Sequence, residues 1–212
     1  MTPSTPRLLA VWVPDWPVVA LGLEAGGRSR PGAPAGREDV PDPALSPVAI
    51  VDGRGVIAAS APARAAGVTV GMRIRVARAL CPALAAIPSR PDREARGFEV
   101  VMEALGDLLA DPLVARPGLA LSGARGPAAW AGGEEALAAA LVEAVAEGAG
   151  AECQVGIADS LLGAVLAARE GVVVPPGRAP EFLSSWPLEA VLTALFTRRS
   201  RREALGLLEV LS

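Results

Sequence analysis

Arginine side chains are the groups with which this sequence can bind a negatively charged ligand. All 20 basic residues are arginine, and the chain contains no lysine, histidine, tyrosine or asparagine. Catalysis by a histidine base or a lysine amine is therefore excluded. Arg64, Arg73, Arg75 and Arg78 lie close together in the sequence, and a guanidinium can hold a phosphate through two parallel hydrogen bonds.

Two short helices joined by a turn are predicted for residues 60–84, which carry these arginines. Gly67 suits a left-handed cap at the end of the first helix, on which Arg64 lies. Gly71 permits a second reversal of the backbone, and the second helix runs until Pro82 ends it. A packed helical hairpin without any ligand is the structural alternative for this segment.

The order of residues in this segment resembles a known family. SAPARAAGVTVGMRIRVARALCPAL is similar to the fingers segment of Y-family translesion DNA polymerases, where Ser-x-x-Ala-Arg-x-x-Gly-Val precedes Gly-Met and a helix ending in Cys-Pro-x-Leu. The start of the chain, PRLLAVWVPDWPVVAL, is most similar to actinobacterial ImuB proteins, polymerase-like accessory factors of DNA-damage mutagenesis. The resemblance covers nearly the whole chain and is looser beyond Val172.

The resemblance implies an α+β fold, with a ferredoxin-like polymerase palm, an inserted small fingers domain and the start of a helical thumb. It assigns residues 1–25 and 88–174 to the palm, 26–87 to the fingers with a flexible loop at 26–47, and 175–212 to a partial thumb. The amphipathic pattern of residues 204–211 has no C-terminal cap, so we expect a fragment of a longer protein.

Hydrophobic periodicity predicts elements in an order that fits such a palm with an insertion. Asp15 is expected to cap the first helix. Strands are predicted at residues 8–13, 114–121 and 152–157, with a hairpin of 48–51 and 56–59. Helices are predicted at residues 16–24, 92–110, 134–147, 160–169 and near 188–196, with Gly171 as a cap and 172–177 as a linker.

Metal-binding carboxylates are the first requirement of nucleotidyl transfer, because they hold two Mg²⁺ ions against the triphosphate. The family has an Asp-x-Asp pattern after its first strand. With Asp15 as the second aspartate, Val13 replaces the metal ligand, and an alignment shifted by one places Trp12 there. Asp15 itself as a ligand is the competing interpretation.

The second carboxylate pair of the family is also absent. It corresponds to Gly118 and Leu119, and no acidic residue occurs between Asp111 and Glu134. The sequence therefore predicts no metal ion and no other cofactor.

The cations that surround the triphosphate in the family are mostly replaced. Arg64 matches the arginine of the fingers, but the accompanying tyrosine is Ala61. The later Asn-Lys-x-x-Ala-Lys is SLLGAV at residues 160–165, so both lysines are lost. Arg64 is thus either a vestigial nucleotide contact or a structural residue that bonds helix-end carbonyls or a nearby carboxylate.

The resemblance implies a catalytically inactive adaptor in SOS-induced, error-prone translesion synthesis and DNA repair. Its implied partners are an error-prone C-family DNA polymerase, a RecA-like protein of the ImuA type and the sliding clamp, the last through regions beyond this sequence. The alternatives are an active translesion polymerase and a non-catalytic module that binds primer-template DNA. Possible DNA contacts are Arg198, Arg199, Arg201 and Arg202, unless they form a solvated face.

Composition limits these alternatives. A net charge of −3 and a pI near 5.2 argue against strong binding to a DNA duplex, although weak contact stays possible. At 51% hydrophobic residues the chain can bury a core, and it has neither a membrane-spanning run nor a secretory signal. We therefore expect a cytoplasmic protein, at the nucleoid after DNA damage.

The cysteines and tryptophans are expected to be structural. Cys81 and Cys153 are too few for a disulfide framework and are predicted to be reduced core thiols. Base stacking is not expected of the tryptophans, since most of them lack a basic residue nearby in sequence. Core or partner-surface positions are predicted instead for Trp12, Trp16, Trp130 and Trp186.

Overall fold

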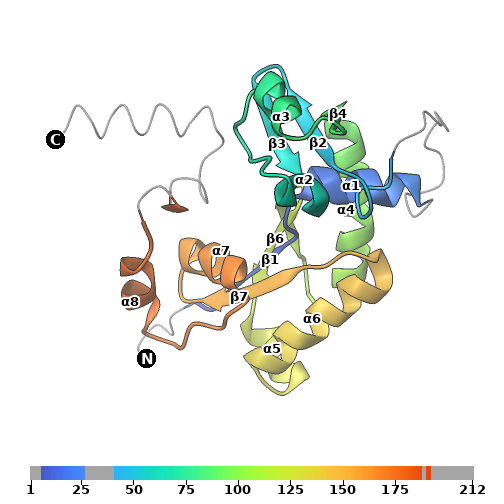
Figure 1. Ribbon diagram of the computed structural model, residues 1–212. Helices are drawn as coiled ribbons and strands as arrows, with labels where there is room; N and C mark the ends of the chain where they lie inside the picture. The colour runs from blue at the N-terminus through green and yellow to red at the C-terminus, as the bar shows by residue number, and fades with distance from the viewer. Residues whose placement is uncertain (1–5, 27–40, 188–189, 192–212) are drawn as a thin grey trace.

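A computed structural model describes residues 6–26, 41–187 and 190–191 (Figure 1). Its strands are β1 (Leu8–Trp12), β2 (Val48–Asp52), β3 (Gly55–Ala59), β4 (Ala85–Pro88), β5 (Leu113–Arg116), β6 (Leu119–Gly123) and β7 (Gln154–Ala158). Its helices are α1 (Trp16–Ala25), α2 (Ala61–Ala65), α3 (Ile74–Leu80), α4 (Pro91–Gly106), α5 (Arg125–Ala131), α6 (Glu134–Ala149), α7 (Leu161–Glu170) and α8 (Ala179–Ser184). The mixed α/β composition agrees with the predicted α+β class.

The larger sheet has the strand order β5-β6-β1-β7, with β1 antiparallel to both of its neighbours. Alternate residues of β1 face different cores, as the two-residue period of a strand requires. Leu9 and Val11 are fully buried in a core that also contains Phe98 of α4 and Leu141 of α6. Ala10 faces the opposite side, where α7 covers β1 and β7. A strand buried on both faces explains the continuous apolar run that begins the chain.

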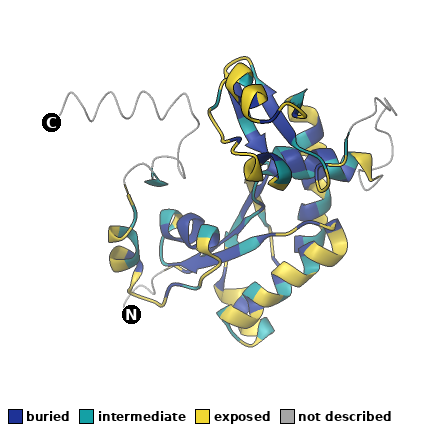
Figure 2. Cartoon of the chain, viewed as in Figure 1, coloured by how far each residue is buried: buried dark blue, intermediate teal, exposed yellow. Residues whose placement is uncertain are grey.

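The smaller sheet has the order β3-β2-β4 and forms a separate module with α2 and α3 (Figures 1 and 2). The predicted hairpin of β2 and β3 around Asp52-Gly53-Arg54-Gly55 is confirmed. Helix α1 packs against this module too, since Val18 and Leu21 share a core with Val48 and Ile50. Helix α1 therefore packs against the cores of both sheets.

Several local predictions are wrong in detail. Residues 114–121 do not form one strand, because the chain reverses at Gly118, whose φ of +86° favours glycine, and so makes the hairpin of β5 and β6. Val172–Val174 is more than a linker: the Val174 amide donates to the Ile157 carbonyl at 2.8 Å, which extends the sheet. The elements β4, α5 and α8 were not predicted.

Arg7, directly before β1, joins four parts of the fold. Its guanidinium is buried and donates to both carboxylate oxygens of Glu134 and, at 2.8 Å, to Asp159 Oδ1 and the Val174 carbonyl. The other oxygen of Asp159 accepts the amide of Gly177. The hydrogen bond from Arg7 lowers the pKa of Asp159, so this carboxylate is ionised over a wide pH range.

Some predictions fall on parts of the chain that are not described. The four arginines at 198–202, most of the loop at 26–47 and most of the thumb lie outside the described residues. Cys81 and Cys153 are free and buried, and burial raises the pKa of Cys153 to about 11. Among the described residues, no helix has the length and hydropathy needed to cross a membrane.

Candidate functional site

The three positions predicted to have lost metal-binding carboxylates come together at one end of the larger sheet. Leu119 pairs with Trp12 in the register of β1 and β6, and the Val13 amide donates to the Gly118 carbonyl at 2.9 Å. Val13 is 1% exposed and Leu119 is 4% exposed. The three positions are therefore neighbours and are buried, whereas their match to the metal-binding positions of the family stays a prediction.

Trp16 fills the space into which a side chain at position 118 would project. A Cβ atom built on Gly118 would lie 2.5 Å from the Cβ of Trp16, which is closer than real Cβ contacts allow. The Trp16 ring packs edge-on against Phe98 at 5.0 Å between centroids, and its indole N–H donates to the Glu94 carbonyl at 2.9 Å. Gly97 allows this close approach, since a Cβ there would meet the ring at 3.3 Å.

The residues at this end of the sheet do not fit a divalent metal ion. Mg²⁺ requires oxygen ligands, and valine, glycine and leucine side chains provide none. Across the described ranges, no three Asp, Glu or Cys side chains are grouped so that they could hold a metal ion. We therefore assign no metal-dependent step to these residues.

Asp15 does not cap α1 with its side chain, in contrast to the prediction. Its backbone is left-handed at φ +47°, which turns the carboxylate away from the first turn of the helix. The carboxylate forms an ion pair with Arg64 of α2, and Arg64 Nη1 also donates to the Ala59 carbonyl at 2.6 Å. Contact with one carboxylate and one carbonyl agrees with a structural role for Arg64, and its nucleotide contact stays a prediction.

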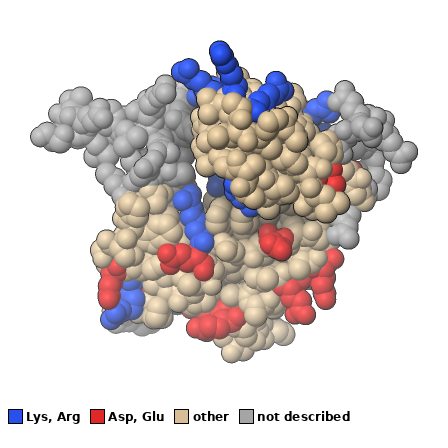
Figure 3. Space-filling model, viewed as in Figure 1, with Lys and Arg blue, Asp and Glu red and all other residues tan. Residues whose placement is uncertain are grey.

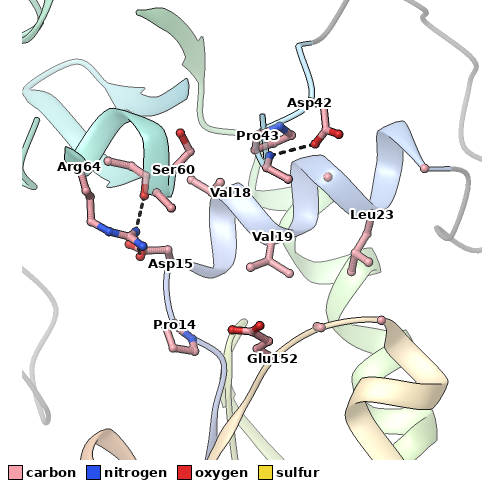
Figure 4. Close-up of a pocket in the computed structure, with 17 residues that line it drawn as sticks. Pro14, Asp15, Val18, Val19, Leu23, Asp42, Pro43, Ser60, Arg64 and Glu152 are labelled. Carbon is pink, nitrogen blue, oxygen red and sulfur yellow. Dashed lines mark hydrogen bonds and ion pairs between the residues drawn. The ribbon is translucent and has the colours of Figure 1, made fainter. Parts of the chain in front are cut away.

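A cavity of about 620 Å³ lies beside this ion pair, between α1, α2, the turn at residues 42–44 and the loop before β7 (Figure 4). Its floor is apolar and includes Val18, Val19 and Leu23. Its charged lining residues are Asp15, Asp42, Glu152 and Arg64. Among the described lining residues, three carboxylates and one guanidinium give a formal charge of −2, which is unfavourable for a triphosphate.

The positions of the two lost lysines have other roles. Ser160, at the place of the family's asparagine, caps α7 by accepting the Gly163 amide at 3.1 Å. Leu161 is 45% exposed, whereas Val165 is buried in the core beneath α7. Neither side chain can replace a lysine ammonium.

A basic and aromatic cluster on the α7 side of the sheet was missed by the sequence analysis. The Arg169 guanidinium lies 5.7 Å from the ring centroid of Trp12, a cation–π geometry. Desolvation lowers the pKa of Arg116, and the nearby positive charge of Arg169 lowers it further. Desolvation also lowers the pKa of Arg169. The sequence did not associate these residues, because α7 brings Arg169 to Trp12 from a distant part of the chain.

The other tryptophans differ in exposure. Trp16 is a core residue, as predicted. Trp186 is half-buried and packs edge-on against Phe182 at 6.1 Å between centroids. Trp130 is 94% exposed, so it belongs to the surface.

Replacing Arg64 by alanine is expected to destabilise the protein more at neutral pH than at about pH 3. Burial raises the pKa of Asp15 above its ordinary value of 3.8, and Arg64 is the largest opposing influence. Without Arg64 the pKa rises further, and a raised carboxyl pKa makes stability fall as pH increases through the interval above 3.8.

The loss at neutral pH should not exceed about 1 kcal/mol, since the pair is partly exposed. Urea unfolding at both pH values measures the difference, and Arg64→Lys is the control that keeps the charge. Equal destabilisation at the two pH values would contradict the assigned coupling.

The sequence and the fold of this chain were both compared with those of known proteins. Residues 34–169 match the model of the impB/mucB/samB family. No curated protein matches the chain. Three similar solved structures are a ternary complex of Dbh, a Y-family DNA polymerase chimera based on Dbh, and DinB from Sulfolobus solfataricus.

The similarity to these structures is a similarity of fold. Their sequence identities are 18%, 19% and 19%, and their TM-scores are 0.64, 0.62 and 0.60, in the same order. Each alignment covers 84% of this chain, and 50%, 51% and 50% of the respective solved chains. The chain thus spans about half the length of these polymerases. Since the family match covers more than half of its residues, the chain belongs to the impB/mucB/samB family of Y-family polymerase domains, and it has their fold.

Proposed function

We propose that this chain has the shape of a Y-family polymerase but does not catalyse nucleotidyl transfer, and that it acts as an ImuB-like adaptor in SOS-induced, error-prone translesion synthesis. One observation carries the proposal: the positions expected to hold metal-binding carboxylates are the buried Val13, Gly118 and Leu119, with Trp16 packed over Gly118. Polymerase chemistry needs carboxylates at these positions, because the metal ions stabilise the attacking and leaving oxygens.

Two further observations support the proposal independently. The cavity next to Arg64 carries an excess of negative charge, which repels a triphosphate. The helix that would supply lysines to the triphosphate carries Leu161 and Val165 instead. Carboxylates and lysines are thus missing from different elements. A single chance substitution cannot explain this pattern, whereas a general loss of polymerase activity can.

The adaptor role includes the partners that the resemblance implies. We propose that the protein joins an error-prone C-family DNA polymerase, a RecA-like protein and the sliding clamp at damaged DNA. In this proposal residues 1–25 and 88–174 form the palm, 26–87 the fingers, and 175–212 the start of the thumb.

Primer extension with the full-length protein tests the central claim. We expect no nucleotide incorporation with Mg²⁺ or Mn²⁺, under conditions in which a family member with intact carboxylates extends the same primer. Metal-dependent incorporation that survives rigorous purification would overturn the proposal and favour an active translesion polymerase. In cells, Asp15→Ala should leave damage-induced mutagenesis intact provided that the variant protein accumulates normally.

The adaptor role needs a separate test, because lack of activity does not demonstrate assembly. Pull-down of the full-length protein with each candidate partner measures it, and the 212-residue chain serves as the comparison. Capture of a partner by this chain alone would assign that contact to the palm and fingers. Failure of the full-length protein to capture any of the three partners would reject the adaptor role.

Binding of primer-template DNA without chemistry is a second candidate function, favoured by the cluster of Trp12, Arg116 and Arg169. No ion pair with a carboxylate is formed by either arginine within the described residues. The Arg169 guanidinium beside the Trp12 ring is suited to a phosphate backbone and a stacked base, and Arg116, opposite Leu119 in the same sheet, adds a second cation. This cluster adjoins Leu119, which lies opposite Trp12 in the sheet.

Replacing Arg116 and Arg169 by glutamate together is expected to weaken binding of a primer-template by about tenfold or more, and to make the affinity less dependent on salt. Fluorescence anisotropy of a labelled DNA over a series of salt concentrations measures both effects. Arg54→Glu with Arg96→Glu, at two exposed positions away from the Trp12 cluster, is the matched control for the change in net charge. Equal weakening by the control would reject a DNA site at the Trp12 cluster.

A further inference from the structure

The outer edge of the larger sheet is only partly covered. β7 is the last strand in the order β5-β6-β1-β7, so one of its edges faces away from β1. At Ile157 this edge is covered by Val172–Val174, through hydrogen bonds to the Val172 carbonyl and from the Val174 amide. The chain reaches this edge from α7 through Gly171, which is left-handed at φ +66° and ends the helix, so no described residue before Gly171 pairs with it there.

The uncovered part of this edge has a predictable hydrogen-bonding pattern. In a strand, successive backbone groups point to alternate edges, so the N–H and C=O of Val155 point the same way as those of Ile157. Ile157 directs both groups outward, toward Val172 and Val174. Val155 therefore presents a donor and an acceptor on the open edge, and in the described part of the chain no segment pairs with them.

A groove of about 860 Å³ runs along this open edge. One side is lined by Cys153 and, in β7, by Gln154 and Val155. Residues 171–173 line the end, and α6 lines the other side. The α6 residues are small or branched: Ala138, Ala139, Val142 and Ala146. Short side chains on α6 leave room for a backbone beside β7, and Val142 and Val172 are 38% and 37% exposed.

The charges at the groove are all negative. Glu135 and Glu143 of α6 are exposed and line it, and no basic side chain does so among the described residues. In the space-filling view the arginines gather over the module of β2, β3 and α3, whereas acidic side chains gather on the half that holds α6 (Figure 3). A partner segment that enters the groove is therefore favoured when it carries lysine or arginine.

We propose that an extended segment of another protein adds to the open edge of β7 as a short strand. The segment carries small or β-branched apolar residues at alternate positions, facing α6, and basic residues that pair with Glu135 and Glu143. Backbone hydrogen bonds to Val155 give affinity, and the groove beneath α6 selects the side chains. The proposal extends the adaptor role by giving the chemistry of one partner, and it is independent of the filled site at Gly118.

A synthetic peptide with valine at the alternate positions that face α6 and arginine at both ends, tested against the full-length protein by fluorescence anisotropy, is a suitable probe. We expect measurable binding below about 1 mM, and binding at least about tenfold weaker for the same peptide with glutamate in place of arginine. A peptide N-methylated at alternate residues on the pairing edge should also bind at least about tenfold more weakly, because it cannot donate to β7.

Protein variants locate the site. Glu143→Arg, which reverses one charge in the groove lining, should weaken binding of the arginine peptide by about tenfold or more. Glu147→Arg is the matched control, because Glu147 is exposed on the same helix but does not line the groove. In hydrogen exchange, the peptide should protect the Val155 amide while leaving the amides of β2 unchanged.

Three results would overturn the proposal. They are absence of binding at about 1 mM peptide, equal binding of the N-methylated peptide, and equal weakening by Glu147→Arg. None of them bears on primer extension or on capture of the other partners, so failure of this inference is distinguishable from failure of the adaptor proposal.

Discussion

Replacing Gly118 by aspartate is expected to destabilise the protein by about 4 kcal/mol or more instead of creating a metal site. The new Cβ would lie 2.5 Å from the Cβ of Trp16, so Trp16 or the hairpin of β5 and β6 has to move. The carboxylate would also enter a core without a cationic partner, since Val13 and Leu119 are its neighbours. Because a domain is stable by only about 5–15 kcal/mol, much of this protein should be unfolded at moderate temperature.

Gly123→Asp, at the far end of β6, is the matched control. No atom lies within 4 Å of a Cβ built on Gly123, which is exposed, so this variant should keep nearly wild-type stability. Thermal and urea unfolding of both variants, followed by circular dichroism, measure the difference. A stable Gly118→Asp variant that binds Mn²⁺ would show that the site is closer to a working polymerase than its packing indicates.

Arg7→Ala is expected to have the second large effect, a loss of about 3–5 kcal/mol. The change removes the hydrogen bonds to Glu134, Asp159 and the Val174 carbonyl together. The Asp159 side chain is only 8% exposed, so its charge would remain buried without its ion-pair partner. The loss is therefore mainly the cost of an uncompensated buried charge.

An exposed arginine gives the control for this prediction. Arg178→Ala removes an ion pair with Glu181 in which both side chains are more than 60% exposed, so stability should change by less than about 0.5 kcal/mol. The urea midpoint of each variant measures these changes. Similar losses for Arg7→Ala and Arg178→Ala would contradict a special role for the buried cluster.

The ion pair of Arg7 and Asp159 also makes the stability of the protein depend on pH. Because the hydrogen bond from Arg7 lowers the pKa of Asp159, the stability from this pair is present above the ordinary pKa of 3.8 and is lost as pH falls through the lower folded value. Wild-type protein should therefore lose more stability than Arg7→Ala between neutral pH and about pH 2.

Local sequence patterns predicted the elements whose signals are contained within a few residues. Asp52-Gly53-Arg54-Gly55 between two apolar runs fixed the hairpin of β2 and β3, and Gly171 ended α7 as expected. The replacement of carboxylates at Val13, Gly118 and Leu119 stays a prediction, and the structure shows that these positions are neighbours at the end of β1 and the start of β6. Val13 and Gly118 are adjacent through one backbone hydrogen bond.

Features that depend on distant contacts were not predictable from the sequence. The partner of Asp15 is Arg64 of α2, whereas local reasoning favoured a helix cap. Arg169 reaches Trp12 only because α7 packs across β1. The short β4 is held by parallel pairing with β2, a contact for which its own sequence carries no signal.

The indole of Trp16 has a consequence for the history of this domain. Its packing against Phe98 and over Gly118 means that an acidic residue cannot return at position 118 until the ring has been replaced by something smaller. Removing the ring first would leave a cavity, a change that itself destabilises a core. Either order of single substitutions passes through a poorly folded intermediate, so on the proposed function the packing of Trp16 opposes the return of a carboxylate at position 118.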